Sequence, residues 1–272
     1  MTRNQAVRTV DRVTDSPWFE RAARAGHVVN GLLHLLLAYI VARIAFGGGG
    51  SADQSGALAV FAGQPGGRVV LWVAAVAFVA LALWRLAEAI LGGKANDPDS
   101  SDGGLSEWFD RGKALALFVL YLSLAWSAVN FATGSGQSSG QQNAGMSARL
   151  MQHTGGKLVL VIVGLIVVAV GGYFVYKGVT KNFLDDLRRG GGTAVTTTGV
   201  IGYTAKGGVI AGAGILVIVA AIRADPSKAS GIDAAIKTLA GLPAGQILLI
   251  LAALGLAAYG VYCFVMSRWA RM

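Results

Sequence analysis

Charged residues are scarce in this chain. They make up 14% of its 272 positions, whereas soluble domains carry about 25%. Only 14 residues are acidic, and Glu88 is the one acid inside any long apolar run. Because a cation-coupled transporter normally places Asp or Glu near the middle of the membrane, this scarcity counts against proton or sodium coupling.

Cysteine is also nearly absent, since Cys263 is the only one. A single thiol can form neither an intrachain disulfide nor a thiolate metal cluster. The His-Glu-x-x-His and Gly-x-x-x-x-Gly-Lys motifs are missing as well. His27 and His34 share one helix face about 10 Å apart along its axis, so they cannot ligate one haem iron together. We therefore expect no enzymatic activity, no metal and no cofactor.

Apolar residues, by contrast, make up 54% of the chain. They gather into six runs, at about 26–46, 68–91, 113–133, 157–178, 203–222 and 246–266. A helix needs about 20 apolar residues to cross the bilayer core, and each run is near that length. The sequence therefore predicts an all-α integral membrane protein with six transmembrane helices.

The chain contains three copies of one unit. Pro65, Thr154 and Pro243 each precede a long apolar run, and successive members of this set stand 89 residues apart. Such spacing indicates an ancestral unit that was triplicated. The expected divisions are a basic N-terminal tail and three repeats, at 1–15, 16–98, 99–186 and 187–272.

Each repeat holds two predicted crossings, so all three copies should face the same way. Parallel repeats imply a rotation axis along the membrane normal, here a pseudo-threefold one. Pro65, Thr154 and Pro243 are called the pivots below. Short stretches at 55–62, 144–152 and 231–240 precede them. We expect them to form three short amphipathic helices on the extracytoplasmic side.

Lys and Arg residues are distributed unevenly between the predicted loops. Fifteen lie in the N-terminal tail, the loops after the second and fourth runs and the C-terminus, and six lie in the opposite loops. The positive-inside rule therefore places both termini in the cytoplasm of a bacterium, with the protein in its plasma membrane. The same bias predicts attraction to anionic headgroups on the cytoplasmic face. Nucleic-acid binding is not expected, because no basic cluster is interleaved with exposed aromatic residues.

Two recurring segments carry a family resemblance. Arg24-Ala25-Gly26-His27 and Gly202-Tyr203 begin first helices, whereas Pro65-Gly66-Gly67 and Pro243-Ala244-Gly245 begin second helices. Over about residues 20–270 this pattern resembles the actinobacterial three-repeat membrane family catalogued as domain of unknown function 1206. The sequence departs from it where His27 and Lys113 replace an aromatic residue and Thr154 replaces proline. The resemblance implies architecture and carries no activity with it.

Two stripes of polar residues lie within predicted helices. They are His27, Asn30 and His34 on the first run, and Ser123, Ser127 and Asn130 on the third. Polar residues inside a span can mark a substrate path or a proton relay. They can equally hydrogen-bond between helices, at about 0.6 kcal/mol each. We favour the second interpretation.

Other candidate residues concern charge and helix packing. Arg85 and Glu88 are three residues apart on one predicted helix and can form an ion pair. This pair could gate or couple a transport path, but we favour the interpretation of an ion pair at the membrane interface. Glycines allow helices to approach closely, and Gly208, Gly212, Gly171 and Gly172 are the predicted packing positions.

Two functional classes stay open. The first is a non-enzymatic accessory or scaffold subunit that associates with a larger membrane complex or with lipids. The alternative is a transporter or channel for small molecules or lipids, with a path near the pseudo-threefold axis.

Overall fold

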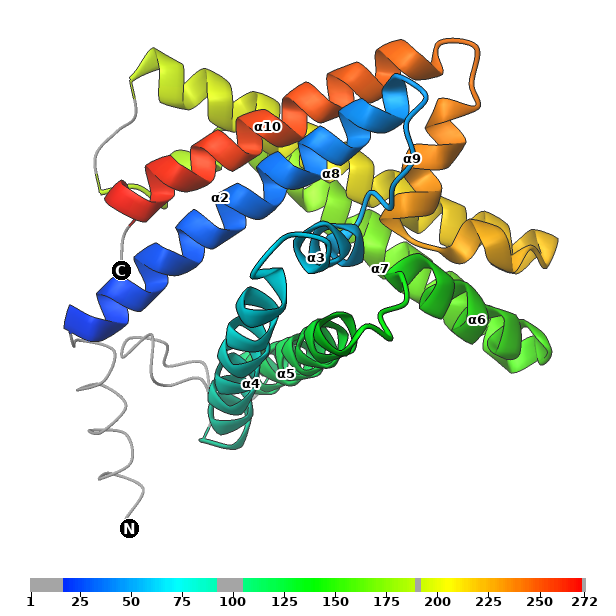
Figure 1. The fold of residues 1–272 in the computed structure, drawn as a ribbon, viewed down its shortest axis with the longest axis horizontal. Coiled ribbons are helices and arrows are strands. Elements are labelled where there is room, and N and C mark those ends of the chain that lie inside the picture. The colour runs from blue at the N-terminus through cyan, green and yellow to red at the C-terminus, as the bar shows by residue number, and fades with distance from the viewer. Residues whose placement is uncertain (1–16, 92–104, 189–191, 271–272) are drawn as a thin grey trace. The chain divides into compact units, whose positions relative to one another are not determined.

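The structure, a computed structural model, describes residues 17–91, 105–188 and 192–270, and helices dominate it (Figure 1). Its long helices are α2 (Pro17–Ala45), α4 (Gly67–Leu91), α5 (Leu105–Thr133), α7 (Thr154–Val179), α8 (Thr193–Arg223) and α10 (Gly245–Trp269). All six are long and apolar enough to cross a membrane. The predicted all-α fold with six membrane-spanning helices is therefore confirmed. The predicted basic tail at 1–15 lies outside the described residues.

A short helix precedes each pivot, as the repeat predicts. These helices are α3 (Gln54–Ala62), α6 (Ser139–Met151) and α9 (Ile232–Ala240), and two 3-10 turns add η1 (Asn182–Leu184) and η2 (Pro226–Ala229). In α9, Ala235 and Ile236 are buried whereas Lys237 and Thr238 are exposed, so this helix is amphipathic. After Ser55, α3 has no polar side chain and is apolar all round, which differs from the expectation. The side of the membrane on which the short helices lie stays a prediction.

The chain forms two compact units. The first covers 1–22 and 58–137 and contains α4 and α5, which pack against each other around Leu58, Leu71 and Ala132. The second covers 23–57 and 138–272 and contains most of α2 together with α6 to α10. The polar groups considered below as a site belong to this second unit.

Helix α8 begins well before the apolar run that predicted it. Thr193–Thr198, expected to lie in a connector, form its first turns. Five of these six residues are β-branched, four threonines and one valine, and they disfavour a helix intrinsically. Tertiary packing overrides that preference, because Gly199 in the next turn lies directly against the ring of Phe183. Lys206 was counted with the loop after the fourth run, although it falls in the predicted run 203–222, and it lies well inside α8.

A glycine just after each pivot is the residue that the turn requires. Gly67, Gly156 and Gly245 stand at the same repeat position, two residues after the pivots Pro65, Thr154 and Pro243. A Cβ atom on any of them would collide with a backbone carbonyl near the end of the preceding short helix. The chain therefore turns back tightly at a glycine, which explains why Thr154 can stand where the other repeats have proline.

Glycines bring α7 and α8 into close antiparallel contact. A Cβ atom on Gly207 would lie 2.6 Å from the carbonyl oxygen of Gly171, and one on Gly214 would lie 2.8 Å from that of Gly164. Small residues of this kind let backbones approach and replace side-chain packing in lipid. The contact uses glycines spaced by seven residues on both helices.

Three other glycines expected at helix contacts lie elsewhere. Cβ atoms on Gly208, Gly212 and Gly172 would meet nothing within 4 Å among the described residues. The packing face of α8 thus carries Gly207, next to the predicted Gly208, and not the predicted Gly-x-x-x-Gly pair. Adjacent helical residues point about 100° apart, so a one-residue difference changes the face.

The same glycine contact recurs between the last helix and the first. Gly31 in α2 aligns with Gly207, and Gly260 in α10 lies 89 residues after Gly171. A Cβ atom on Gly31 would lie 2.9 Å from the carbonyl oxygen of Gly260, and the reverse distance is also 2.9 Å. In both places the second helix of one repeat packs on the first helix of another. The predicted pseudo-threefold order is consistent with this recurrence and stays a prediction.

Candidate functional site

Polar side chains from α2, α8 and α10 meet around the ring of Tyr259. The Nζ atom of Lys206 lies 4.0 Å from the centroid of this ring and 4.7 Å from that of Phe174 on α7. Both are cation–π distances. Lys206 is half-buried, and it forms no ion pair with any residue that the structure describes.

Helix α2 supplies two more polar groups. The imidazole of His34 lies 4.6 Å from the Tyr259 ring, centroid to centroid, and its Nδ1–H donates to the Asn30 carbonyl at 2.8 Å. The Asn30 side chain donates to the Cys263 sulfur at 3.4 Å. We call these five residues, Asn30, His34, Lys206, Tyr259 and Cys263, the Lys206 centre. His27 forms no hydrogen bond within the described part of the chain.

The repeat explains why these side chains occupy one level of the bundle. Lys206 and Asn30 stand at the same position of two first helices, because Gly26–Gly31 aligns with Gly202–Gly207. Their partners Phe174 and Cys263 are likewise 89 residues apart on two second helices. Lys206 on Phe174 and Asn30 on Cys263 are therefore the same contact in two copies.

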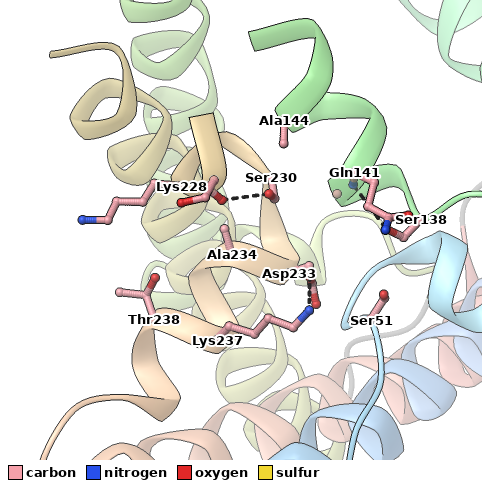
Figure 2. Close-up of a pocket in the computed structure, with 12 residues that line it drawn as sticks. Ser51, Ser138, Gln141, Ala144, Lys228, Ser230, Asp233, Ala234, Lys237 and Thr238 are labelled. Carbon is pink, nitrogen blue, oxygen red and sulfur yellow. Dashed lines mark hydrogen bonds and ion pairs between the residues drawn. The ribbon is translucent and has the colours of Figure 1, made fainter. Parts of the chain in front are cut away.

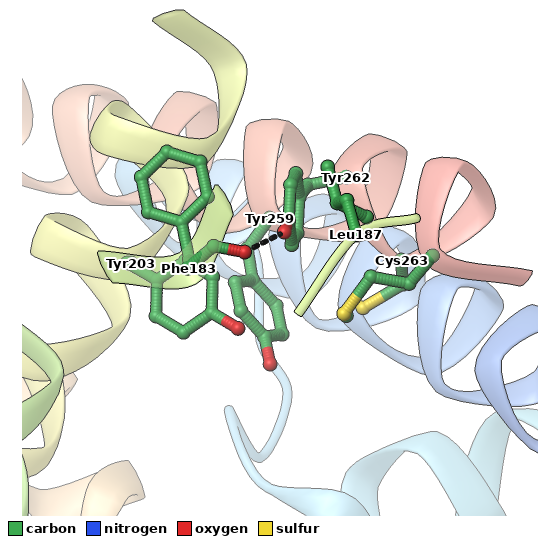
Figure 3. Close-up of a cluster of buried hydrophobic side chains, with 7 residues drawn as sticks. Phe183, Leu187, Tyr203, Tyr259, Tyr262 and Cys263 are labelled. Atoms are coloured by element: carbon green, nitrogen blue, oxygen red, sulfur yellow. Dashed lines mark hydrogen bonds between the residues drawn. The ribbon is translucent and has the colours of Figure 1, made fainter. Parts of the chain in front are cut away.

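Aromatic residues close the centre on one side (Figure 3). The Phe183 ring is fully buried and stacks on Tyr203 at 5.3 Å between centroids, while the Tyr262 ring meets it edge-on at 5.2 Å. The Tyr262 hydroxyl donates to the Phe183 carbonyl at 3.0 Å. Segment 182–188, which follows α7, is thereby held against α10.

Asp186, in the segment that carries Phe183, forms a salt bridge with Lys177. Lys177 at the end of α7 pairs with Asp186 at 2.7 Å, and its ammonium also lies 5.8 Å from the Tyr203 ring. Asp186 thus neutralises Lys177 and leaves the charge of Lys206 without a carboxylate. The centre is consequently electropositive.

The remaining predicted residues form local contacts in the first unit. The Ser123 hydroxyl donates to the Leu120 carbonyl of its own helix at 2.7 Å, and Ser127 and Asn130 are half-buried on α5. This stripe and the stripe of His34 belong to different units. Arg85 and Glu88 form an ion pair at 2.6 Å on α4, with both side chains partly exposed.

A second group of polar contacts joins the short helices of the second unit. The Asp233 carboxylate, 5% exposed, accepts from the Ala52 amide at 2.9 Å and from Lys237 at 2.7 Å. Asp53 caps α3 by accepting from the Gly56 amide at 2.8 Å. Ser55, which donates to Asp53, accepts from the Ser139 amide at 2.8 Å. Segments from all three repeats are joined here, and sequence reasoning found neither acid because the two do not align with each other.

One motif shared with hydrolases lies beside these contacts. Gly136–Gly140 matches Gly-x-Ser-x-Gly, a pattern that in α/β-hydrolases exposes a nucleophile between a strand and a helix. Here Ser138 is the N-cap of α6, and its Oγ accepts from the Gln141 amide at 3.2 Å. The residues described before it belong to α5 and a turn, so the strand-to-helix geometry of that motif is missing there.

Similarity to known proteins follows the repeats. An uncharacterized protein, YxxB of Bacillus subtilis (strain 168), is 28% identical over 262 residues, which are 94% of this chain and 93% of the relative. No solved structure matches the chain. A family model described as Domain of Unknown Function (DUF1206) matches residues 25–92, 112–181 and 201–270, once in each repeat. The predicted resemblance is confirmed, and the chain belongs to the DUF1206 family.

Proposed function

We propose that this protein is a non-enzymatic accessory protein of the bacterial plasma membrane that binds an anionic lipid headgroup at the Lys206 centre. The observation that carries the proposal is the ammonium of Lys206, which lies inside a span and contacts aromatic rings but no carboxylate among the described residues. An ionisable group in such a place is costly and usually functional. The phosphate of a lipid supplies the missing negative charge.

The surroundings favour a lipid over a small soluble anion. Tyr173 and Tyr176 on α7 are each 58% exposed and flank Phe174, the ring beneath Lys206. The Tyr173 ring lies 6.1 Å from the Phe174 ring, centroid to centroid, and offers an exposed apolar surface for an acyl chain next to the charge that would hold the headgroup. The Lys and Arg distribution assigns this end of α8 to the cytoplasmic leaflet, which is rich in anionic lipid.

The proposal assigns no catalysis to the centre. Cys263 accepts a hydrogen bond from Asn30, and His34 donates to a carbonyl of its own helix. The first bond joins α2 to α10 and the second fixes the His34 ring on its own helix. Hydrogen bonding between helices is the role favoured for the stripe by the sequence. Lys206 is left as the group available to a ligand.

Lys206→Met should weaken phosphatidylglycerol binding by about tenfold or more, because one charge-assisted hydrogen bond contributes about 1.5–3 kcal/mol. Delipidated protein would be titrated with phosphatidylglycerol or phosphatidylcholine and the bound lipid counted by native mass spectrometry. Lys206→Arg should retain binding. Lys113→Met, which removes an exposed charge from the same predicted face, is the matched control.

Equal lipid retention by Lys206→Met and Lys113→Met would contradict the proposal. So would full displacement of the lipid by millimolar glycerol phosphate, because that result would identify the ligand as a soluble anion. Elution of Lys206→Met as a monodisperse peak shows that a loss of lipid does not reflect misfolding.

One observation favours transport as a second candidate. A pocket of about 680 Å³ lies between α6 and the connection η2–α9. This connection joins α8 to α10, the two helices that carry Lys206 and Tyr259. A carrier would move a labelled anionic lipid between leaflets of a proteoliposome faster than empty liposomes do. Transfer at the rate of empty liposomes would leave binding alone as the function.

A further inference from the structure

We infer that a monovalent alkali cation binds at the carboxylate of Asp53, in the connector between α2 and α3. The Asp53 residue is only 7% exposed, and its Oδ2 atom is buried without a hydrogen-bond partner among the described residues. Buried polar atoms in folded proteins nearly always have a partner, so an oxygen of this kind points to a ligand.

The other oxygen of this carboxylate fixes the side chain in place. Asp53 Oδ1 accepts a hydrogen bond from the Gly56 amide at 2.8 Å and another from the Ser55 hydroxyl. Ser55 is itself 1% exposed and accepts from the Ser139 amide of the second repeat at 2.8 Å. The negative charge is therefore held inside the fold by groups that cannot move independently.

The charge of Asp53 is not balanced by any cation of the described residues. The nearby acid Asp233, which accepts from the Ala52 amide, is neutralised by Lys237 at 2.7 Å (Figure 2). Asp53 forms no ion pair with any residue that the structure describes. A buried charge is costly unless it is paired. A water molecule at Oδ2 would leave this charge in place, whereas a cation both contacts the oxygen and neutralises it.

The chemistry around Asp53 suits a hard, monovalent cation. The Ser51 carbonyl oxygen lies against the same turn, since a Cβ atom on Gly56 would overlap it, and it accepts no hydrogen bond from a described residue. Carboxylate and backbone carbonyl oxygens are ligands of hard cations, including Na⁺. Calcium sites generally use several carboxylates, but no three His, Cys, Asp or Glu side chains gather within the described ranges. One unpaired carboxylate therefore favours a single positive charge.

This site differs from those that the sequence argued against. The expectation of no metal was based on missing thiolate and histidine motifs, which say nothing about oxygen ligands. Asp53 also lies outside the spans, because α2 ends at Ala45. The Ala52 amide and the Ser55 hydroxyl join this connector to the third and second repeats. A bound ion would thus stabilise the place where all three repeats meet.

Equilibrium dialysis of the purified full chain against radioactive sodium tests the inference, with N-methylglucamine keeping the ionic strength constant. We expect saturable binding of one ion per chain. Excess K⁺ should displace the label, whereas N-methylglucamine is too large to reach a buried oxygen. Na⁺ should also raise the unfolding midpoint in scanning fluorimetry, because a ligand that binds only the folded protein stabilises it.

Asp53→Asn should weaken Na⁺ binding by about tenfold or more, because it removes the charge but keeps a residue that caps helices equally well. Asp225→Asn is the matched control, since Asp225 caps η2 through the Ser227 amide at 3.2 Å but is partly exposed. Its Na⁺ affinity should be unchanged. Lys206→Met should also bind Na⁺ normally, which separates this site from the proposed lipid site.

Three results would overturn the inference. The first is no saturable sodium binding together with equal midpoints in Na⁺ and N-methylglucamine, as expected if a water or a proton satisfies Oδ2. The second is sodium binding that Asp53→Asn and Asp225→Asn retain equally. The third is saturable binding of Ca²⁺ that Na⁺ cannot displace. Dialysis of the unchanged protein decides the first and third even if Asp53→Asn does not fold.

Discussion

Replacing Gly207 with valine should abolish the folded protein. The new Cβ atom would lie 2.6 Å from the Gly171 carbonyl oxygen and 2.7 Å from the Val175 amide nitrogen, and both are backbone atoms that no rotamer change can move. Overpacking in a core typically costs about 1–3 kcal/mol, and more where the structure cannot yield. Separation of α7 from α8 would also remove Phe174 from Lys206. We expect almost no monodisperse protein by fluorescence-detected size exclusion.

Gly208→Val is the matched control for this change. It makes the same substitution at the next residue of the same helix, with the same change in helix propensity, yet its Cβ atom would meet nothing within 4 Å. Its folded yield should stay near that of the unchanged protein. If the two valine variants lose yield equally, the loss does not come from the α7–α8 contact.

Phe183→Ala should be the most destabilising truncation in the aromatic cluster. The ring is fully buried between Tyr203 and Tyr262, and Phe→Ala changes in a core cost about 3–5 kcal/mol. Segment 182–188 should then detach from α10 and become a protease site. Scanning fluorimetry would report the lowered midpoint, and limited proteolysis with mass spectrometry would locate the cleavage.

Phe46→Ala serves as the reference for this truncation, because its ring is 73% exposed at the end of α2. Its midpoint should shift far less. Tyr262→Phe removes only the hydrogen bond to the Phe183 carbonyl and should cost about 1 kcal/mol. A midpoint for Phe183→Ala equal to that of Phe46→Ala would contradict the structural role given to segment 182–188.

The fold could be predicted because membrane crossing depends on local composition. Each of the six runs is apolar over about 20 residues whatever its neighbours, and the 89-residue spacing of Pro65, Thr154 and Pro243 is visible without a structure. Helix–helix contacts are harder to predict than spans, because each helix carries several glycines and only some of them lie on the face that packs. Gly207 and Gly214, spaced by seven like Gly164 and Gly171, carried a signal that the shorter Gly208–Gly212 spacing obscured.

The Lys206 centre could be predicted only in part. Asn30 and His34 were found, because they form a stripe on one helix. Lys206 was missed because it stands near the start of an apolar run, where a lysine is typical of a loop. Its environment is formed by the rings of Tyr259 on α10 and Phe174 on α7, which are remote in sequence and could not be foreseen. Asp233 was missed for the same reason, since its contact with the Ala52 amide joins two different repeats.

The contact between Gly31 and Gly260 has a consequence for biosynthesis. Helix α2 leaves the ribosome first and α10 last, so the face of α2 that carries Gly31, Asn30 and His34 has no α10 partner while the rest of the chain is translated. Until translation ends, the polar groups on that face are exposed either to lipid or to an insertase. A nascent chain arrested before α10 therefore lacks the helix that completes the packing of its own first span.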